Sequence, residues 1–303
     1  LESKFIAGIK KYFTNVKFDL VLYSTPPITL QKSVEFVKKR DNAKTYLLLK
    51  DIFPQNAVDL GIIKKTGVNS LLYRFFRNKE KKLYMSSDFI GCMSEANVNF
   101  LINHNPEIDN SIIEICPNSI EPMNIEKDSN LIKDIKNKYK LPLDKTIFIY
   151  GGNLGKPQGI EFLIDCLSLN EKNDKSYFLI VGSGTEFNRL QVYFDNEKPQ
   201  NSRLIKQLPK NDYELLANAC DVGLLFLDKR FTIPNFPSRV LSYMQASMPV
   251  LAATDINTDI GKVIENGKFG FWCESIEAKE FNKLVIKLCD LNLRRRMGKN
   301  ART

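Results

Sequence analysis

The sequence predicts an α/β protein built from two doubly wound domains, and three observations lead to this prediction. The chain has 303 residues, which is more than one ordinary domain uses and comfortable for two. Short β-branched runs alternate with helical patterns along its length, as in parallel sheets wrapped by helices. The strand candidates are nearly continuous apolar runs, which is typical of strands buried on both faces.

The first half contains few strand candidates. They cover residues 18–24, 45–50, 88–93 and 112–116. No strand, glycine turn and helix unit precedes residue 18, so this domain is predicted to be small or incomplete at its start. Residues 123–145 are polar and are interpreted as a linker, helical over residues 131–139. The predicted domains are therefore residues 1–122 and 146–303, joined by this linker.

The second half predicts six strands with short connections, which is a doubly wound pattern. The strands are expected at residues 146–152, 177–184, 203–209, 221–227, 249–254 and 269–273. Helices are expected between them at residues 157–169, 185–194, 211–220, 238–247 and 258–267.

Composition excludes several classes of protein. Hydrophobic residues make up 43% of the chain and charged residues 26%, so the chain is not mainly disordered. No apolar run reaches the roughly 18 residues of a membrane-spanning helix, and the start does not resemble a signal peptide. The six cysteines form no Cys-x-x-Cys pair and read as buried thiols of a reducing compartment. With His104 as the only histidine, interpreted as an exposed loop imidazole, the sequence predicts no metal site and no cofactor.

Positive charge is concentrated in the first third of the chain. Residues 1–90 hold 17 Lys and Arg against eight Asp and Glu, whereas residues 91–303 are balanced. In residues 71–84, basic residues alternate with leucines and aromatics, so a helix there is able to lie on an anionic membrane surface. A core-facing helix with a solvated basic face is the commoner outcome for an isolated segment. Nucleic acid ranks below the membrane because no nucleic-acid-binding motif accompanies the charge.

Three predicted turns are suited to binding an anion at the carboxyl ends of parallel strands. The first contains three glycines between residues 151 and 155, followed by Lys156. The second is residues 182–184, and the third is residues 236–239. In the third, Pro237 suits a first helical turn, Ser238 or a residue before it can cap the helix, and Arg239 is placed for bidentate contact with phosphate. Each alone is as often a simple tight turn. Neither the dinucleotide-binding nor the P-loop glycine spacing is present. The three turns together therefore suggest a site for a nucleotide diphosphate that differs from the usual NAD and ATP sites.

These motifs resemble a known family. The runs YGGNLGKPQGIEFLI, FLIVGSGTEFNRL, CDVGLLFL and NFPSRVLSYMQASMPVLAATD resemble the C-terminal half of a GT-B glycosyltransferase of family 4, in the branch that transfers amino sugars in bacterial surface polysaccharide assembly. In the first half, STPP, LLLKDIFPQNAVDLGII and ICPNSIE resemble that branch's acceptor-side elements. The resemblance implies two Rossmann-like domains that face a cleft, the first of them incomplete here.

The resemblance also implies an activity. The enzyme would move a sugar, an N-acetylated amino sugar in this branch, from a UDP-sugar to a lipid-linked saccharide, with retention of configuration and without a metal ion. It would work in the cytoplasm, peripherally on the inner face of the plasma membrane. A UDP-sugar epimerase of the same fold and a non-catalytic transferase-like partner remain as alternatives.

Site residues follow from the same resemblance. Asp51 would face the reacting sugar, and Arg239 would take the pyrophosphate. The predicted donor-binding residues are Gly152, Asn153, Gly155, Lys156, Gly182, Gly184, Leu208, Arg230, Pro237, Ser238 and Arg239. The sequence departs from the family where two glutamates are usual, because those positions are Pro234 and Ser242, and Ser247 replaces a usual glycine. The missing carboxylates favour the non-catalytic alternative.

Overall fold

The computed structural model describes residues 2–67, 70–123 and 128–303, and the chain divides into two compact units. The first unit comprises residues 1–118 together with two short segments, residues 230–236 and 257–259. The second comprises residues 119–229, 237–256 and 260–303. Residues 124–127 of the predicted linker lie outside the described residues. The two short segments come from the half of the chain in which the sequence predicts the second domain.

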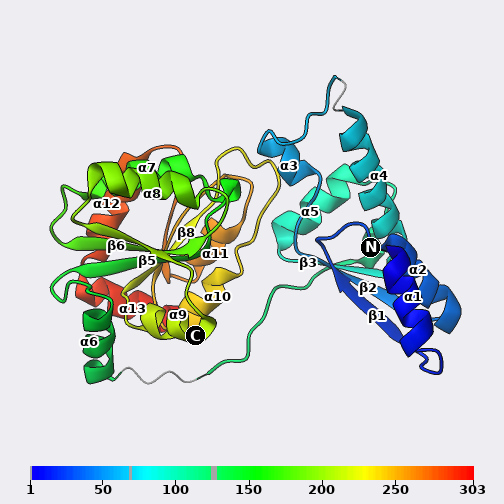
Figure 1. Ribbon diagram of the computed structural model, residues 1–303, viewed down its shortest axis with the longest axis horizontal. Helices are drawn as coiled ribbons and strands as arrows, with labels where there is room; N and C mark the ends of the chain where they lie inside the picture. Colours follow the sequence, from blue (N-terminus) through cyan, green and yellow to red (C-terminus); the bar gives the residue numbers. More distant parts are fainter. Residues whose placement is uncertain (1, 68–69, 124–127) are drawn as a thin grey trace. The chain divides into compact units, whose positions relative to one another are not determined.

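The first unit contains a four-stranded parallel sheet in the order β1-β2-β3-β4, which confirms the four predicted strands (Figure 1). Its elements are α1 (Glu2–Tyr12), β1 (Leu20–Ser24), α2 (Gln31–Asp41), β2 (Lys44–Leu49), α3 (Gln55–Asp59), α4 (Ser70–Met85), β3 (Phe89–Cys92), α5 (Glu95–His104), a 3-10 turn (Asn110–Ile112) and β4 (Ile113–Ile115). The basic segment predicted to be helical is α4. No helix in the described ranges is both long and apolar enough to cross a bilayer.

The two faces of this sheet differ in burial. Leu47, Leu49 and Ile90 lie on the covered face and are almost completely buried, and α2 and α5 contact the sheet. On the opposite face, Leu22 is 59% exposed and Phe89 is 44% exposed. Parallel strands are usually buried on both faces, so an exposed apolar face is unusual for such a sheet.

The second unit contains six parallel strands, as the sequence predicts, and the structure shows their order to be β10-β9-β8-β5-β6-β7. Its elements are α6 (Ser129–Lys138), β5 (Thr146–Asn153), a 3-10 turn (Lys156–Gln158), α7 (Ile160–Asn170), β6 (Ser176–Ser183), α8 (Phe187–Glu197), β7 (Ser202–Lys206), α9 (Lys210–Asn218), β8 (Val222–Phe226), α10 (Arg239–Gln245), β9 (Val250–Thr254), α11 (Ile260–Asn266), β10 (Gly270–Glu274), α12 (Ala278–Leu288) and α13 (Leu291–Arg302).

Helices cover both faces of this sheet. Figure 1 places α7, α8 and α12 on one face and α9 and α10 on the other. Buried apolar residues of α7, α8 and α12 pack with alternate residues of β5, β6 and β8, such as Phe148, Phe178 and Leu224. The strand order reverses beside β5, because β6 pairs with one edge of it and β8 with the other. Ligands of doubly wound sheets bind at this kind of switch point, at the carboxyl ends of the strands.

The prediction for the first helix of this unit was wrong at its start. A helix was expected from residue 157, but a 3-10 turn occupies residues 156–158 and α7 begins only at Ile160. Gly159, between the two, has φ 57°, which is left-handed backbone that interrupts a helix. The turn after β5 is therefore longer than expected.

Ser247 also adopts left-handed backbone, with φ 51° between α10 and β9. Left-handed backbone destabilises the folded state by about 1–2 kcal/mol when the residue has a side chain. Glycine avoids this strain, but its greater conformational freedom in the unfolded chain cancels part of the gain. We expect Ser247→Gly to raise the free energy of unfolding by about 0.5–1 kcal/mol, and the melting temperature by about 1–4 °C. Urea and thermal unfolding measure the change. Ser242→Gly, in the middle of α10, is the matched control and should lower stability instead. A loss of stability in Ser247→Gly would contradict the prediction.

Candidate functional site

The two glycine-rich turns of the second unit lie side by side. Strands β5 and β6 pair over their full length, which aligns Gly152 with Gly182 and Asn153 with Ser183 at their carboxyl ends. The two segments are also joined beyond the strands, because Leu154 N–H donates to the carbonyl of Ser183 and Glu186 N–H donates to the carbonyl of Leu154. The first two predicted turns therefore form one continuous surface at the edge of the sheet.

Glycine is required at this edge for two reasons. Gly152 has φ 130° and Gly184 has φ 155°, which are backbone conformations that other residues rarely adopt. The backbones also approach closely: a Cβ built at Gly182 would lie 2.0 Å from the carbonyl oxygen of Gly152, and one at Gly184 would lie 2.4 Å from that of Leu154. Side chains are thus excluded, and main-chain groups form the surface.

Gln158 braces the first turn. Its Oε1 accepts hydrogen bonds from the main-chain N–H of Gly155 at 3.0 Å and from the side-chain amide of Asn153 at 3.3 Å. Asn153 and Gly155, both predicted to bind the donor, are therefore held by Gln158, for which no such bracing role was predicted. Lys156 follows them with an exposed side chain, so its charge is at the surface beside the turn.

Arg239 lies against the same turn. It is the first residue of α10 and is half-buried, and its guanidinium carbon sits 4.6 Å from the centre of the Tyr150 ring. A Cβ built at Gly152 would come within 1.9 Å of its Nη2, so the guanidinium occupies the space beside that glycine. Within the described ranges, no carboxylate lies in ion-pair distance of Arg239. An aromatic ring, and not an acidic residue, holds this cation.

Tyr150 links the guanidinium to the glycine turn. It is the buried residue just before Gly151 in β5, and its hydroxyl donates a hydrogen bond of 2.7 Å to the carbonyl of Asn153. Burial raises the pKa of the Tyr150 phenol, although the neighbouring Arg239 guanidinium opposes the rise. The phenol is therefore neutral near pH 7 and keeps its proton for this hydrogen bond.

Two further tyrosines complete the surroundings of Arg239. Tyr213 of α9 lies against Gly151, where a built Cβ would be 2.1 Å from its ring, and its buried hydroxyl has no hydrogen-bond partner among the described residues. Tyr243 of α10 is buried and donates to the main chain of β5 or β8, with carbonyls of both strands 3.2 Å away. Sequence reasoning missed all three tyrosines. Only Tyr150 had a usable signal, as the aromatic residue that directly precedes the glycines.

The remaining predicted residues of this unit are placed less directly. Leu208 is half-buried just beyond β7, and its neighbour Gln207 accepts a hydrogen bond of 2.6 Å from Ser183, which ties that segment to the second turn. Ser238 occupies the cap position of α10 but its side chain makes no capping bond, and Pro237 lies before the helix. The predicted capping role of Ser238, and the placement of Pro237 in the first helical turn, were therefore wrong.

Asp51 belongs to the first unit and follows β2. Its carboxylate accepts two hydrogen bonds from the Asn56 side chain, at 2.8 and 2.9 Å, and its main chain is bound to Thr25. Burial raises the pKa of Asp51, and the hydrogen bonds from Asn56 and from the N–H of Ile52 oppose the rise. Asn56 thus fixes the direction of this carboxylate. Neither Asn56 nor Thr25 was predicted.

Two predicted features fall on loops that group with the first unit. Arg230 is exposed at the start of residues 230–236. Pro234, which stands where the family usually has a glutamate, is buried, and its carbonyl accepts a hydrogen bond from Asn97 of α5. Ser242, at the second such position, is exposed on α10 in the second unit.

The first unit also has a small, partly open pocket beside the Asp51 loop. It is lined by Ile52, Pro54, Gln55, Lys65, Tyr73, Arg77, Glu80, Phe100, His104 and Asn105. His104 is exposed as expected, but it ends α5 and stacks on Phe100 with ring centres 3.8 Å apart, so the loop assignment was wrong. Within the described ranges, no group of three or more His, Cys, Asp or Glu is arranged to hold a metal ion, and all six cysteines are free thiols.

The arrangement in the second unit is suited to an anion. It combines the glycine-lined carboxyl edge of two strands with a guanidinium that has no acidic partner within the described ranges. A guanidinium makes bidentate contacts with phosphate oxygens, and main-chain N–H groups approach a phosphate closely where side chains are absent. A nucleotide diphosphate carries the negative charge that such a surface would attract.

Comparisons with known proteins find similarity to glycosyltransferases. The family described as glycosyl transferases group 1 matches residues 132–303, more than half of the chain. A curated relative from Pseudomonas aeruginosa, named "Probable glycosyltransferase WbjE", is 26% identical over 292 residues, which are 95% of this chain and 70% of the relative.

Solved structures share the fold. WaaG, a glycosyltransferase involved in lipopolysaccharide biosynthesis, superposes with a TM-score of 0.68 at 14% identity and covers 88% of this chain and 75% of its own. Alr3699/HepE of Anabaena, in complex with UDP, has a TM-score of 0.72 at 16% identity and covers 99% of this chain and 75% of its own.

Proposed function

Because this chain belongs to the family of group 1 glycosyl transferases, we propose that it moves a sugar from a UDP-sugar to a lipid-linked saccharide, with retention of configuration and without a bound metal ion. The fold is GT-B, with two Rossmann-like α/β units. The chain is accordingly a glycosyltransferase, and the proposal concerns its donor, its acceptor and its mechanism.

The observation that carries the proposal is the guanidinium of Arg239 beside the two glycine turns, which has no carboxylate within ion-pair distance among the described residues. A departing nucleoside diphosphate gains negative charge as the bond to the sugar breaks, and a preorganised cation with main-chain N–H groups stabilises that charge. The Tyr150 ring holds the guanidinium from one side, so the guanidinium needs little reorganisation when negative charge develops on the diphosphate. The residues proposed to contact the donor are Gly152, Asn153, Gly155, Lys156, Gly182, Gly184, Leu208, Arg230, Pro237, Ser238 and Arg239.

UDP is the proposed nucleotide because HepE, which has a similar fold, was crystallised in complex with UDP. The base would lie near the second turn and the Leu208 segment, which the Ser183–Gln207 hydrogen bond joins. The sugar would be an N-acetylated amino sugar, as the resemblance to that branch of the family implies.

The acceptor would be bound by the first unit. Asp51 is the residue proposed to face the reacting sugar. Asn56 fixes the direction of its carboxylate, and burial limits the access of water to that carboxylate. The nearby pocket offers the Tyr73 ring together with Lys65 and Gln55, a mixture of aromatic and polar groups that suits a saccharide. Polysaccharide assembly is the proposed pathway, since WaaG acts in lipopolysaccharide biosynthesis. Work on a lipid-linked acceptor would place the enzyme on the anionic inner face of the plasma membrane.

The proposal is tested in two steps with the purified protein. A thermal-shift panel of UDP-, GDP- and dTDP-sugars identifies the donor, because a ligand at 100 times its Kd stabilises the folded state by about 2.7 kcal/mol. We expect only UDP-sugars to raise the melting temperature. The stabilising donor is then supplied with lipid-linked saccharides from bacterial membranes, and release of UDP and formation of the longer saccharide are measured.

Each outcome selects one function. UDP release that depends on the lipid acceptor supports the transferase. Binding of a UDP-sugar without turnover would instead indicate a non-catalytic partner, which the absence of carboxylates at Pro234 and Ser242 favours. Conversion of the sugar without an acceptor would indicate an epimerase.

A further inference from the structure

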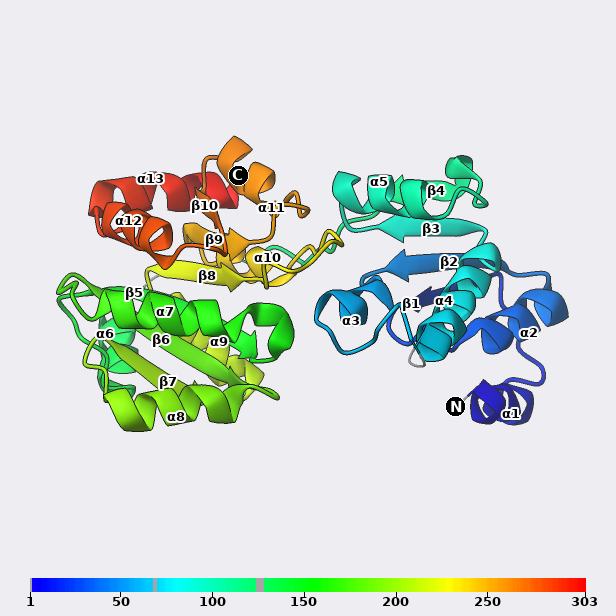
Figure 2. The same ribbon diagram turned by 90° about the horizontal axis from the view of Figure 1, so that it is seen from above.

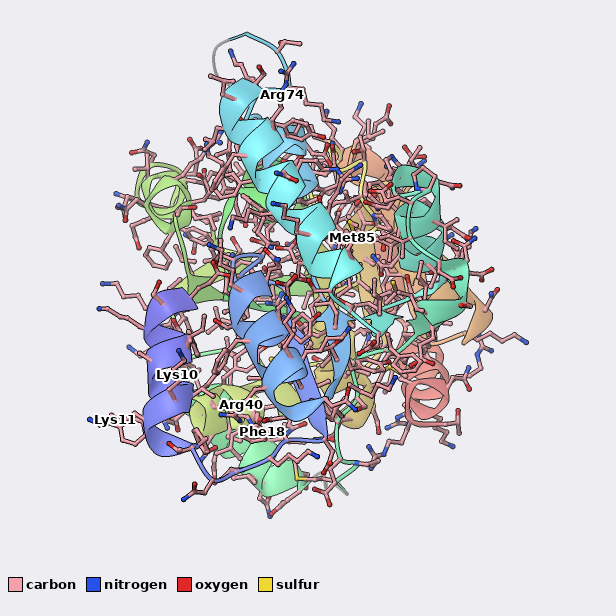
Figure 3. The ribbon with its side chains drawn as sticks, turned by 90° about the vertical axis from the view of Figure 1, so that its right-hand side faces the viewer. Lys10, Lys11, Phe18, Arg40, Arg74 and Met85 are labelled. Atoms are coloured by element: carbon pink, nitrogen blue, oxygen red, sulfur yellow. The ribbon has the colours of Figure 1, made fainter. Side chains whose placement is uncertain are left out.

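The outward surface of α4 and of the loop before it combines basic and large apolar side chains. Four apolar residues are far more exposed than core residues: Ile62 at 61%, Leu71 at 67%, Leu72 at 49% and Phe75 at 54%. At the other end of the helix, Met85 is 69% exposed. We call the surface formed by Ile62, Lys64, Lys65, Leu71, Leu72, Arg74, Phe75, Lys82 and Met85 the α4 surface. Figure 3 shows Arg74 and Met85 at opposite ends of the same helix, on the side of the first unit that faces the viewer.

The opposite side of α4 is firmly attached to its own unit, so the outward face is not a misplaced core face. Phe76 packs edge-on against Phe53 with ring centres 5.0 Å apart. Arg77 pairs with the buried Glu80 at 2.6 Å and donates to the main-chain carbonyl of His104 at the end of α5. Leu83 is fully buried. The helix therefore presents its basic and apolar stripe outward because its inner side is already occupied.

The loop is held beside the start of the helix. The ammonium group of Lys65 lies 5.4 Å from the centre of the Tyr73 ring, which brings residues of the loop and the first turn of α4 together. Figure 2 shows α4 beside α2 in the first unit, and the two helices are in contact. Basic and apolar side chains of the two segments thus contribute to one surface.

The charge of the α4 surface has one sign. Residues 61–87 contain a single acidic residue, Glu80, and it is 3% exposed. Among the described residues, no ion pair involves Lys64, Arg74 or Lys82. A surface that is cationic, exposed and interleaved with large apolar side chains complements an anionic bilayer, in which lipid headgroups meet the basic groups and acyl chains receive the apolar ones.

We propose that the α4 surface docks on an anionic lipid bilayer. This inference deepens the proposed function, which supplies a lipid-linked acceptor, and it assigns the docking to the loop and the outward stripe of α4. Nucleic acid fits less well, because the exposed side chains are mostly aliphatic and only Phe75 among them offers a ring on which a base can stack.

Vesicle cosedimentation of the whole chain tests the proposal without donor or acceptor. The protein should bind phosphatidylcholine vesicles that contain one part in about three of phosphatidylglycerol, should not bind phosphatidylcholine alone, and should be released by salt. Arg74→Gln should weaken binding about fivefold, the effect of one basic residue near the surface. Leu71→Ser with Phe75→Ser should weaken it at least about tenfold, since both side chains are expected to enter the acyl boundary.

Matched variants in the second unit control for lost exposed apolar area. Val192 on α8 is 58% exposed and Ile286 on α12 is 56% exposed. Val192→Ser with Ile286→Ser removes a similar exposed apolar area away from the α4 surface, so this variant should bind vesicles as the unchanged protein does. Equal loss in the two double variants, or no binding to anionic vesicles, would overturn the proposal. So would displacement of the vesicles by a single-stranded oligonucleotide whose binding needs Arg74 and Lys82 but not Leu71 and Phe75.

The same experiment separates this inference from the proposed function. The Leu71→Ser, Phe75→Ser variant should still be stabilised by a UDP-sugar, since neither residue lies in the donor-binding unit. Vesicle binding without any response to nucleotide sugars would leave the docking surface in place and remove the proposed transfer.

Discussion

Replacing Arg239 with alanine is expected to lower sugar transfer by about 10²–10³-fold while the protein still folds. The side chain is half-buried beside the glycine turns, and the residues described place no carboxylate within ion-pair distance of it. Its removal therefore takes away the cation proposed to bind the leaving diphosphate, without leaving a buried acid unpaired. Turnover with a saturating UDP-sugar measures the loss, and the melting temperature reports on folding.

Arg189→Ala is the matched control for Arg239→Ala. Arg189 lies on α8 of the same unit, is half exposed and pairs with Glu161 at 2.6 Å, so its loss should leave transfer unchanged. Unchanged transfer in Arg239→Ala would remove this residue from the site. A fall in both variants would point to a general effect of lost positive charge.

Tyr150 variants ask how the guanidinium is held. Tyr150→Phe keeps the ring beside Arg239 but loses the hydroxyl, which bonds the Asn153 carbonyl and the Arg239 side chain, so transfer should fall only slightly. Tyr150→Leu also removes the ring, and turnover should fall towards that of Arg239→Ala because the cation is no longer oriented. A fall in the same proportion for both variants would attribute the effect to the turn and not to the stacking.

The second large effect is expected from Gly182→Ala. The added methyl group would lie 2.0 Å from the carbonyl oxygen of Gly152, a main-chain atom of the paired strand that cannot turn away. Relief requires the ends of β5 and β6 to separate, and overpacking of this kind costs about 1–3 kcal/mol. We expect a melting temperature lower by roughly 2–10 °C, together with loss of stabilisation by a UDP-sugar because the two turns no longer align.

Gly8→Ala controls for the replacement itself. Gly8 lies in α1 with nothing within 4 Å of a built Cβ, so alanine there should stabilise the helix by about 0.5–1 kcal/mol. If Gly182→Ala melted at the temperature of the unchanged protein and still bound the donor, the close approach of the two turns would not matter for the site.

Much of the second unit could be predicted from the sequence. All six strands and the doubly wound pattern followed from apolar runs between glycine turns, because a strand buried on both faces is apolar at nearly every position. The order of the strands in the sheet was not predicted. The start of α7 could not be predicted, since Gly159 takes a left-handed conformation that residue type permits but does not require.

The composition of the proposed donor site was less accessible. Gly152, Gly184 and Arg239 were proposed as single residues, from their types and their positions after strands. The ring that holds Arg239 was not found, because Tyr150 lies 89 positions earlier in the chain and looks like an ordinary core tyrosine. Asn56, which orients Asp51, was missed because asparagine is usually a surface residue. It also lies just after a proline, where no regular hydrophobic pattern marks its position.

By itself, the sequence determined the strands, the glycine turns, the family and the concentration of positive charge in the first third. Local residue type decides these features, since strand burial and left-handed turns depend on each residue's own side chain. The tertiary structure alone decided which cation lies on which ring, which two glycines touch and which side of α4 faces outward. Those relations join residues distant in the chain, and they arise only when strand pairing and helix packing bring the residues together.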